Sequence, residues 1–491
     1  MIEKQKIVDL YTQYHNDSVK QYGNKTAVLM ECGNFFEMYS KEDDPKIMKQ
    51  IAKDLNLQMT RRSKEKHALS AKENSYMSGF QKFQIDRYIN ILQEKNYTIV
   101  LVEEQGLGPD YDRVITNIIS PGTKMDLHKN DSNYLMCIYI TTYTNKFKHN
   151  FNYYAVSIID VSTGKLIVYE NENVYNFIHS YKPNEIIFYN LTEIDIESII
   201  NDLDLHNISF NEHKEFNKMY LKNSYENEFF KKIYKDTGLL SPIEYLDLEM
   251  FKDTITSLIL LLEYVNKLSP VLINNLDKPI IWDNSDILEL RNNTIYQLNI
   301  VKNNTIESFS KINCLLDVID KTNTAMGSRE FKNNVLNPTL NEDKLNSIYD
   351  FVENLKSNHD IFTQQLKNIL DVERGNRKLI LNIIKPHEFS KYDESYICII
   401  KLLNIINENY KDTFNNILNI KIEDSIKFMN EFYEIYNSTY DAQKMRRYGP
   451  YDTSINFFKE GNYLQIDNVE NEIIESKQVF KDLREKCINL C

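Results

Sequence analysis

The spacing of apolar residues changes once along this 491-residue chain, near residue 240. Before that point, short apolar runs typical of strands, such as those at 26–31 and 98–105, alternate with segments of helical period. After it, apolar residues recur every three to four positions. The change predicts α/β domains in the first half of the chain and an all-α part in the second.

The first predicted domain covers residues 1–127 and mixes helices with strands. The turn-prone pair Gly33-Asn34 separates two of its apolar runs, and the Pro-Gly pair at 121–122 favours a type II turn that closes the domain. In chain order we expect a helix at 1–20, strands at 26–31 and 35–39, helices that begin after Pro45 and near Ile85, and a strand at 98–105.

Two further domains are expected, at 128–243 and 244–491. The second domain again alternates strands with helices, and its strands fold back at Thr163-Gly164. The third begins with a long apolar helix at 246–268 and contains long, thinly apolar helices typical of lever-like structures. Its later helical segments are expected at 341–370, 390–410, 424–440 and 467–489.

Cysteine usage and hydropathy indicate a soluble, intracellular protein. The six cysteines form no CxxC pair, so the pattern of a zinc site is missing and a reducing compartment is indicated. The chain starts with a polar helix and not with the apolar core of a signal peptide. The longest apolar run, 258–262, is too short to cross a bilayer, so no membrane partner is expected.

The segment Gly-Asn-Phe-Phe-Glu at 33–37 is the most informative stretch of the chain. Taken alone, its residues fit one buried aromatic beside a solvated carboxylate on a strand. Its place between a strand and a helix resembles the reading motif of MutS-type DNA mismatch-repair proteins. The resemblance implies that Phe35 stacks on a mispaired base and that Glu37 contacts it. Strand alternation places Phe36 on the opposite side, in the core.

Further blocks resemble the same family in the same order. The blocks are MSGF at 77–80 with TIVLVEEQ at 98–105, RVITNIISPGT at 113–123, AVSIIDVSTGKL at 155–166, and segments 315–338, 371–389 and 457–473. The resemblance implies a mixed α/β mismatch-binding domain, a ribonuclease H-like α/β connector domain, and a long-helix lever domain that ends near the start of the clamp. The segment ECGNFFEMYS at 31–40 resembles the giant-virus and coral-mitochondrial branch more than bacterial members. The cytoplasm, a viral factory and an organelle are therefore all open as the location.

Function follows from the resemblance as an expectation. The chain is expected to bind double-stranded DNA that contains a mismatch or a small loop, and to form a homodimer when full length. Its net charge is −13, so cations that face phosphates must be concentrated locally. Residues 53–95 hold nine Lys or Arg and five Asp or Glu. Their tightest cluster, Arg61, Arg62, Lys64 and Lys66, fits either a phosphate-facing patch or a solvated loop.

No enzyme activity is expected within these residues. A phosphate-cradling G-x-x-x-x-G-K-[ST] loop does not occur in the sequence, so ATP and Mg²⁺ are expected only in the ATPase half of full-length relatives. We expect this chain to be a fragment or the product of a split gene. No catalytic residue, metal ligand or cofactor-binding residue is expected in it.

Two rival functions stay open. The connector could be a metal-dependent nuclease, for which Asp160 is the one evident carboxylate, although two metals would need several converging carboxylates. Alternatively the chain could be an interaction scaffold that does not read DNA. Burial of the Phe35 ring favours the scaffold, whereas an exposed ring beside Glu37 favours mismatch sensing.

Overall fold

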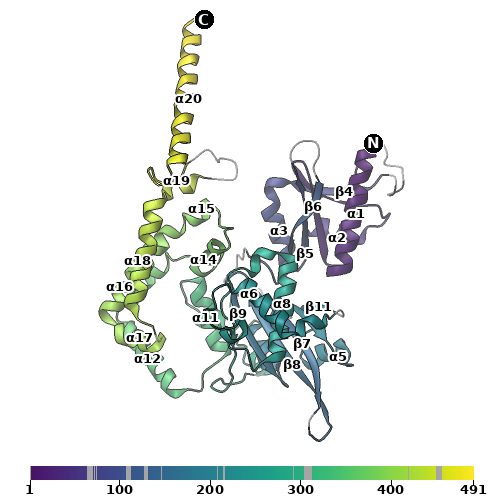
Figure 1. Ribbon diagram of the computed structural model, residues 1–491, viewed down its shortest axis with the longest axis vertical. Coiled ribbons are helices and arrows are strands. Elements are labelled where there is room, and N and C mark those ends of the chain that lie inside the picture. Colours follow the sequence, from purple (N-terminus) through teal and green to yellow (C-terminus); the bar gives the residue numbers. More distant parts are fainter. Residues whose placement is uncertain are drawn as a thin grey trace. The chain divides into compact units, whose positions relative to one another are not determined.

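The computed structural model describes residues 2–63, 70, 72, 74–106, 112–125, 131–144, 146–206, 208–213, 216–290, 292–302, 312–418, 420–448 and 456–490. The chain folds into two compact units (Figure 1). The first unit is formed by residues 1–285 and 289–298, and the second by 286–288 and 299–491.

A mixed sheet forms the core of the first part of unit 1. Its strand order is β3-β4-β2-β1-β5-β6. The bounds are β1 (Thr26–Cys32), β2 (Phe35–Ser40), β3 (Thr60–Arg61), β4 (Tyr76–Gln81), β5 (Thr98–Gln105) and β6 (Asp112–Ile119). The β1–β5 pair is parallel and the other neighbours are antiparallel. The predicted strands at 26–31, 35–39 and 98–105 are confirmed.

Helices cover both faces of this first sheet (Figure 1). The bounds are α1 (Ile2–Tyr22), α2 (Lys46–Asp54), η2 (Lys82–Gln84) and α3 (Ile85–Glu94). On one face, Tyr11 of α1 packs edge-on against Tyr39 of β2. On the other, Tyr88 of α3 stacks on Phe80 of β4. Apolar side chains thus meet on both sides of the central strands, which is why β1 and β5 are almost continuously apolar.

A second six-stranded sheet follows, in the order β11-β10-β7-β8-β9-β12. Its strands are β7 (Tyr134–Thr144), β8 (Asn150–Asp160), β9 (Lys165–Asn171), β10 (Glu185–Asn190), β11 (Ser209–Glu212) and β12 (Ile280–Ile281). Strands β7, β8 and β9 form an antiparallel meander, and β10 joins β7 in parallel. This mixed α/β arrangement fits the predicted connector domain. Its shorter helices are α4 (Tyr175–Tyr181), α5 (Ile196–Asp202), η3 (Lys218–Leu221), α6 (Asn223–Ile233), α7 (Pro242–Tyr245), η4 (Pro270–Ile273) and α9 (Asn292–Gln297).

Helix α8 (Lys252–Leu268) packs against β7, β8 and β9 of this second sheet. Ser257 Oγ donates to Cys137 O at 3.3 Å. The sequence placed this helix in the third domain, beyond residue 243, yet unit 1 extends to residue 298. The apolar run did predict a buried helix, but hydropathy does not identify the surface that buries it.

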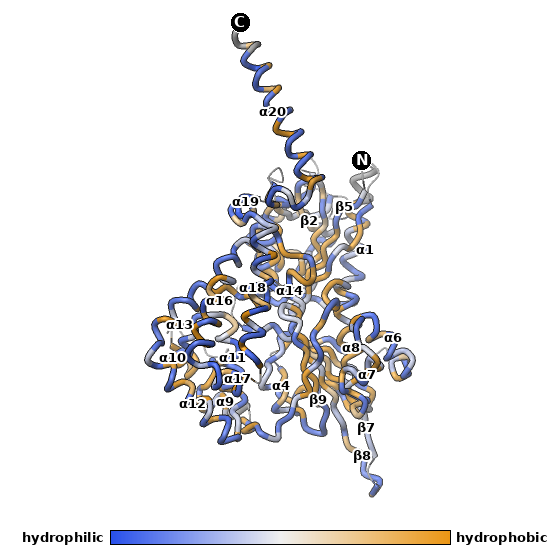
Figure 2. Tube along the Cα trace, turned by 60° about the vertical axis from the view of Figure 1, so that its left-hand side comes forward, coloured by the Kyte–Doolittle hydropathy of each residue, from blue (hydrophilic) through white to orange (hydrophobic). Residues whose placement is uncertain are grey.

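Unit 2 is helical throughout its described residues, apart from isolated bridges. Helices α16 and α18 pack against each other. Figure 2 shows apolar residues at intervals along the mostly hydrophilic α20. The helices are α10 (Leu315–Ile319), α11 (Ala325–Leu336), α12 (Glu342–Lys356), α13 (His359–Leu366), α14 (Val372–Ile380), α15 (Pro386–Phe389), α16 (Tyr392–Asn409), α17 (Lys411–Leu418), α18 (Ile422–Thr439), α19 (Ala442–Arg447) and α20 (Leu464–Leu490). The predicted helical second half is confirmed, except that β12 (Ile280–Ile281) lies in it and joins the second sheet.

Candidate nucleic-acid interface

The hairpin of β1 and β2 places Phe35 at one end of the first sheet. Cys32 pairs with Phe35 across the two-residue turn Gly33-Asn34. Gly33 has a φ of 60°, the left-handed conformation that such turns require and that glycine adopts without steric cost. The backbone N–H of Lys82 donates to Asn34 O at 2.8 Å. Phe35 therefore starts its strand at a narrow tip whose turn is tied to the neighbouring segment.

The rings of Phe35 and Phe36 have opposite environments. Phe36 is 1% exposed and lies 6.1 Å from Phe80, centroid to centroid. Phe35 is 43% exposed. Full burial of a phenylalanine contributes roughly 1.5–3 kcal/mol, much of which this position forgoes. The alternation predicted for the two residues is confirmed, and the exposed ring is the outcome that favours sensing over a scaffold.

Glu37 lies on the same face of β2 as Phe35. The Tyr39 hydroxyl donates a hydrogen bond to Glu37 Oε2. Burial and this bond raise the pKa of Tyr39, so the hydroxyl keeps its proton and stays a donor. Among the residues that the structure describes, no hydrogen bond reaches Glu37 Oε1. One oxygen of this half-buried carboxylate can therefore accept a bond from a ligand.

Gly79 of β4 lies directly opposite Glu37 in the β2–β4 ladder. A Cβ at position 79 would lie 2.6 Å from Phe36 O and 3.1 Å from Glu37 Cγ. The first of these distances is too short for any real side chain without a backbone shift. The glycine of the MSGF block therefore leaves space for the backbone of Phe36 and the side chain of Glu37. The segments 33–37 and 77–80 are thus adjacent in the fold.

Ion pairs hold the strands beneath the hairpin turn. The buried carboxylate of Glu31 pairs with Lys82 and accepts from Glu104 N at 3.3 Å. Arg113 donates to Glu31 O at 3.0 Å and pairs with Glu104 at 2.5 Å. Gly33 N donates to Glu104 Oε1 at 3.4 Å. The turn that carries Phe35 is thus connected by hydrogen bonds to three other strand ends.

The structure separates the two arginines of the predicted phosphate patch. The Arg61 guanidinium lies 3.7 Å from the centroid of the Tyr76 ring and donates to Asn74 O at 2.9 Å, so it supports the sheet edge. The Arg62 guanidinium lies 5.3 Å from the centroid of Tyr39, which places it near the ring that holds Glu37. Lys64 and Lys66 lie outside the described residues.

An exposed aromatic residue that the sequence analysis did not single out lies at the same sheet end. Phe83 is 60% exposed and follows β4 in the short helix η2. Gln81, two residues earlier, pairs with Phe35 across the β2–β4 ladder. The sequence could have indicated this residue, because Phe83 ends the MSGFQKF stretch just beyond strand β4.

Asp160, the candidate nuclease carboxylate, is buried at the end of β8. It accepts hydrogen bonds from Asn133 N at 3.2 Å and from Ser162 N and Oγ at 3.0 and 2.6 Å. It thus stabilises the β8–β9 turn. No group of three or more His, Cys, Asp or Glu side chains that could hold a metal occurs in the part of the chain that the structure describes.

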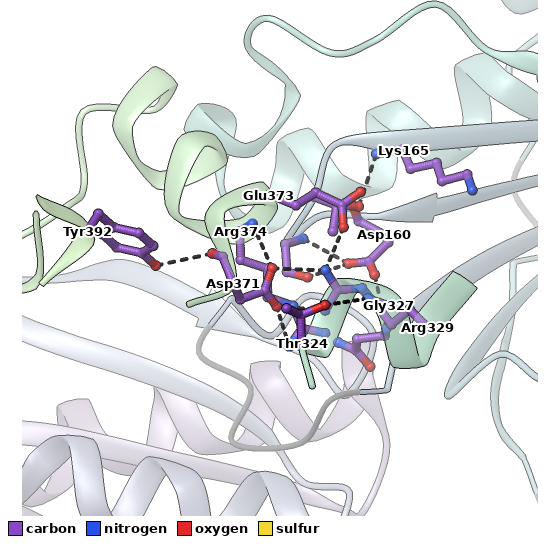
Figure 3. A network of polar contacts seen from close by, with 12 residues as sticks. Asp160, Lys165, Thr324, Gly327, Arg329, Asp371, Glu373, Arg374 and Tyr392 are labelled. Atoms are coloured by element: carbon purple, nitrogen blue, oxygen red, sulfur yellow. Dashed lines mark hydrogen bonds and ion pairs between the residues drawn. The ribbon is translucent and has the colours of Figure 1, made fainter. Parts of the chain in front are cut away.

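Residues of the sequence blocks at 315–338 and 371–389 hold helices of unit 2 together (Figure 3). Arg329 of α11 binds Asp371 through two hydrogen bonds of 2.6 and 2.9 Å and also pairs with Glu373. Burial alone would raise the pKa of Asp371, but Arg329 outweighs it and holds that pKa below its ordinary value. Tyr392 of α16 donates to Asp371 O at 3.2 Å. These motif residues therefore join α11, α14 and α16.

Across the described ranges, none of the helices combines the length and the apolar composition that a membrane crossing needs.

Comparison with known proteins identifies two regions. The family model of MutS domain I matches residues 9–128, and that of MutS domain III matches residues 293–489. The chain is 29% identical to a mutS homologue of Acanthamoeba polyphaga mimivirus, a DNA mismatch repair protein by description, over 99% of this chain and 48% of the relative.

Bacterial relatives match over a similar span. The chain is 26% identical to the DNA mismatch repair protein MutS of Caldanaerobacter subterraneus subsp. tengcongensis, over 98% of this chain and 52% of the relative. It is also 26% identical to the protein of that name from Clostridioides difficile, over 98% and 47%. The chain thus spans about half the length of the curated relatives it matches.

Proposed function

Because this chain belongs to the MutS family, as its domain I and domain III show, we propose that it binds duplex DNA at mismatches through the tip of the β1–β2 hairpin. The observation that carries the proposal is an exposed Phe35 ring next to a carboxylate with one free oxygen, Glu37. Both side chains lie on one face of a strand that starts at a tight, tethered turn.

The exposed ring can act as a wedge at a weakened base step. A mispaired step is easier to unstack and kink than a paired one, so an apolar side chain inserted from the minor groove senses deformability. Stacking on a base contributes roughly 1–3 kcal/mol and does not depend on which base is present. Phe35 therefore suits the recognition of a defect whose sequence varies.

Glu37 can add discrimination against sound duplex. A carboxylate near the phosphate backbone lowers affinity for any DNA, since like charges repel. A displaced base frees its Watson–Crick N–H groups, one of which can donate to Glu37 Oε1 and offset that cost, whereas in a sound pair those N–H groups are held by the partner base. The repulsion between Glu37 and the phosphates therefore lowers the affinity mainly for perfectly paired duplex.

Local cations would hold the phosphates on either side of the tip. Lys82 borders the hairpin turn and pairs with Glu31, and Arg62 lies near Tyr39. We assign backbone contacts to Arg62, beside Tyr39, and to Lys64 and Lys66 on sequence alone. Arg61 packs on Tyr76 and donates to Asn74 O at the sheet edge. Phosphate contacts of this kind position the protein without reading sequence.

Neither rival function gains support from a specific contact. A buried Phe35 ring would have favoured the scaffold function, and the ring is exposed. The nuclease reading requires carboxylates that converge on Asp160, whose oxygens are engaged by Asn133 and Ser162 in the described residues. We propose further that these 491 residues alone bind neither ATP nor Mg²⁺ and do not account for the homodimer expected of full-length relatives. Binding of a fluorescent ATP analogue by this chain would contradict that assignment.

Competition binding tests the reading function. Fluorescence anisotropy of the full chain with a matched and a G·T-mismatched duplex should show tighter binding to the mismatch. Phe35→Ala should remove most of that preference, since roughly 1–3 kcal/mol of stacking is lost. Phe428→Ala removes an exposed ring from α18 and serves as the matched control. A Phe35→Ala variant that keeps the parental preference would show the proposal to be wrong.

A further inference from the structure

The hairpin of β7 and β8 continues beyond the second sheet as a two-stranded arm, described at residues 141–144 and 146–153. The β7–β8 ladder runs out to the pair Thr144 and Asn150. On one side, β10 pairs with β7 only as far as Ile140. On the other, β9 pairs with β8 only from Tyr154. Within the described ranges of the chain, the arm therefore projects from the sheet without a neighbouring strand on either edge.

Side-chain contacts hold the arm in a fixed conformation. Tyr143 packs edge-on against Tyr153 at 5.4 Å and lies 6.3 Å from Phe151, centroid to centroid. The Tyr143 hydroxyl donates to Asp253 at the start of α8, at 2.8 Å, and the side chains of Thr144 and Asn150 bond at 2.7 Å. An isolated two-stranded ribbon is marginally stable in water, so these contacts are what keeps this one extended.

The tip of the arm combines positive charge with an exposed aromatic ring. Lys146, Phe147, Lys148 and His149 are all exposed, and Phe147 is 82% exposed. No Asp or Glu occurs in residues 132–159 of a chain whose net charge is −13. The acids that face the arm, Asp253 and Glu170, lie at its base, where they are bonded to Tyr143 and Thr254.

Protection of strand edges does not explain this composition. Exposed lysines do keep free strand edges from pairing with other chains. A large exposed phenylalanine between two lysines works against that role, because it adds an apolar surface to an unpaired edge. Basic side chains interleaved with an aromatic ring are instead typical of surfaces that contact nucleic acid.

We propose that the arm, residues 141–144 and 146–153, is a second contact for duplex DNA, separate from the hairpin tip of the first sheet. The major groove of B-DNA admits a two-stranded β-ribbon. Lys146 and Lys148 would bind phosphates, and Phe147 would contact sugars or bases at the groove. The arm's other face carries Thr142, Thr144, Asn150 and Asn152, whose side chains can donate and accept hydrogen bonds. This contact does not read mismatches and can fail while the proposed reading function holds.

Salt dependence of homoduplex binding tests the arm. Two phosphate contacts contribute about 1.8 to the slope of log K against log salt concentration. Lys146→Gln/Lys148→Gln in the full chain should lower the slope by about that amount while keeping the ratio of mismatch to homoduplex affinity. Lys231→Gln/Lys232→Gln removes the same charge from exposed positions of α6 and should leave the slope unchanged. Equal slopes in the two double variants would overturn the proposal.

A fluorescent variant identifies the partner. The single tryptophan, Trp282, is buried, so Phe147→Trp adds an exposed reporter at the tip. Duplex DNA should quench the added emission, and polyglutamate at equal charge concentration should not. Quenching by polyglutamate but not by DNA would show that the arm binds acidic protein surfaces and would overturn the assignment to DNA. Phe35→Ala should lose mismatch preference and keep the salt slope, which distinguishes failure of one proposal from failure of the other.

Discussion

The hydroxyl of Tyr39 donates a hydrogen bond to Oε2 of Glu37, two residues away on the same face of β2. Tyr39 itself packs edge-on against Tyr11 of α1, with ring centroids 5.5 Å apart. The bond therefore ties the carboxylate at the candidate reading site to the core between α1 and the first sheet. The orientation of Glu37 is fixed before any ligand arrives.

Replacing Tyr39 by phenylalanine should weaken mismatch preference without abolishing DNA binding. A hydrogen bond to a charged group contributes roughly 1.5–3 kcal/mol, and its loss leaves Glu37 free to turn away from the base. The ratio of dissociation constants for mismatched and matched duplex measures the effect. Tyr97→Phe removes another buried tyrosine's bond to a carboxylate, the one to Asp54 Oδ2 at 2.8 Å, and should leave the ratio unchanged. Identical ratios in both variants would argue against a positioning role for Tyr39.

Replacing Glu37 by alanine should raise the affinity for perfect duplex. Removal of the repulsion between carboxylate and phosphates is expected to contribute about 1.4 kcal/mol, or about tenfold in the dissociation constant. Mismatch affinity should change less, because the bond to the displaced base is lost at the same time. Anisotropy titrations at fixed salt measure both constants. Weaker homoduplex binding by this variant would contradict the proposed penalty.

Replacing Phe83 by alanine should weaken binding to matched and mismatched duplex alike. The exposed ring lies at the same sheet end as Phe35, so the loss of stacking should cost roughly 1–3 kcal/mol in affinity. Since Phe83 does not start the hairpin strand, the mismatch ratio should persist. Phe428→Ala again provides the control for loss of an exposed ring. Unchanged affinity for both duplexes would place Phe83 outside the interface.

Arg329→Met should destabilise unit 2. The change removes the bidentate partner of Asp371, a half-buried carboxylate that keeps Arg374 at 3.5 Å. Breaking a fully buried pair from one side costs roughly 3–5 kcal/mol, so we expect a loss below that range but above that of an exposed pair. Urea unfolding followed by helical circular dichroism measures the free energy of unfolding. Lys427→Gln breaks an exposed pair with Glu431 on α18, and such pairs contribute roughly 0–1 kcal/mol. A loss no larger than that of Lys427→Gln would contradict the structural role of Arg329.

The same pair predicts a dependence on pH. Asp371 has a folded-state pKa below its ordinary value of 3.8, since Arg329 outweighs the effect of burial. A carboxylate with a lowered pKa contributes stability above its unfolded pKa, and that stability is lost as pH falls through the folded pKa. The parent chain should therefore lose stability below about pH 4, and Arg329→Met should lose less over that range. Urea midpoints at pH 6 and pH 3 compare the two.

The sequence pattern was sufficient to predict features that depend on neighbouring residues alone. The opposite environments of Phe35 and Phe36 follow from the two-residue period of a strand, and Gly33-Asn34 forms the turn that its composition favours. Helix α8 shows the limit, because its apolar residues predict burial and leave open whether a sheet or other helices provide it. Only the packing against β7 and β8 shows which.

For the candidate site, too, the sequence predicted individual residues but not the contacts between them. The sequence identified Glu37 as a site residue but not its hydrogen bond with Tyr39. Strand alternation places the two side chains on one face, but it does not predict where the tyrosine hydroxyl points. The sequence also grouped Arg61 with Arg62, although the ring of Tyr76 engages only the former. Contacts between strands that are distant in sequence, such as Gly79 opposite Glu37, became apparent only from the fold.

The tethered turn at Gly33-Asn34 has a mechanical consequence. It is joined to Lys82 and Glu104 and rests on the Glu31–Arg113 contacts, so the tip has little freedom to yield when it meets a double helix. Because the tip is rigid, the DNA must deform when the two come into contact. The free energy of binding would then depend on how readily each dinucleotide step opens. Sites would be ranked by the deformability of the DNA and not by its base sequence.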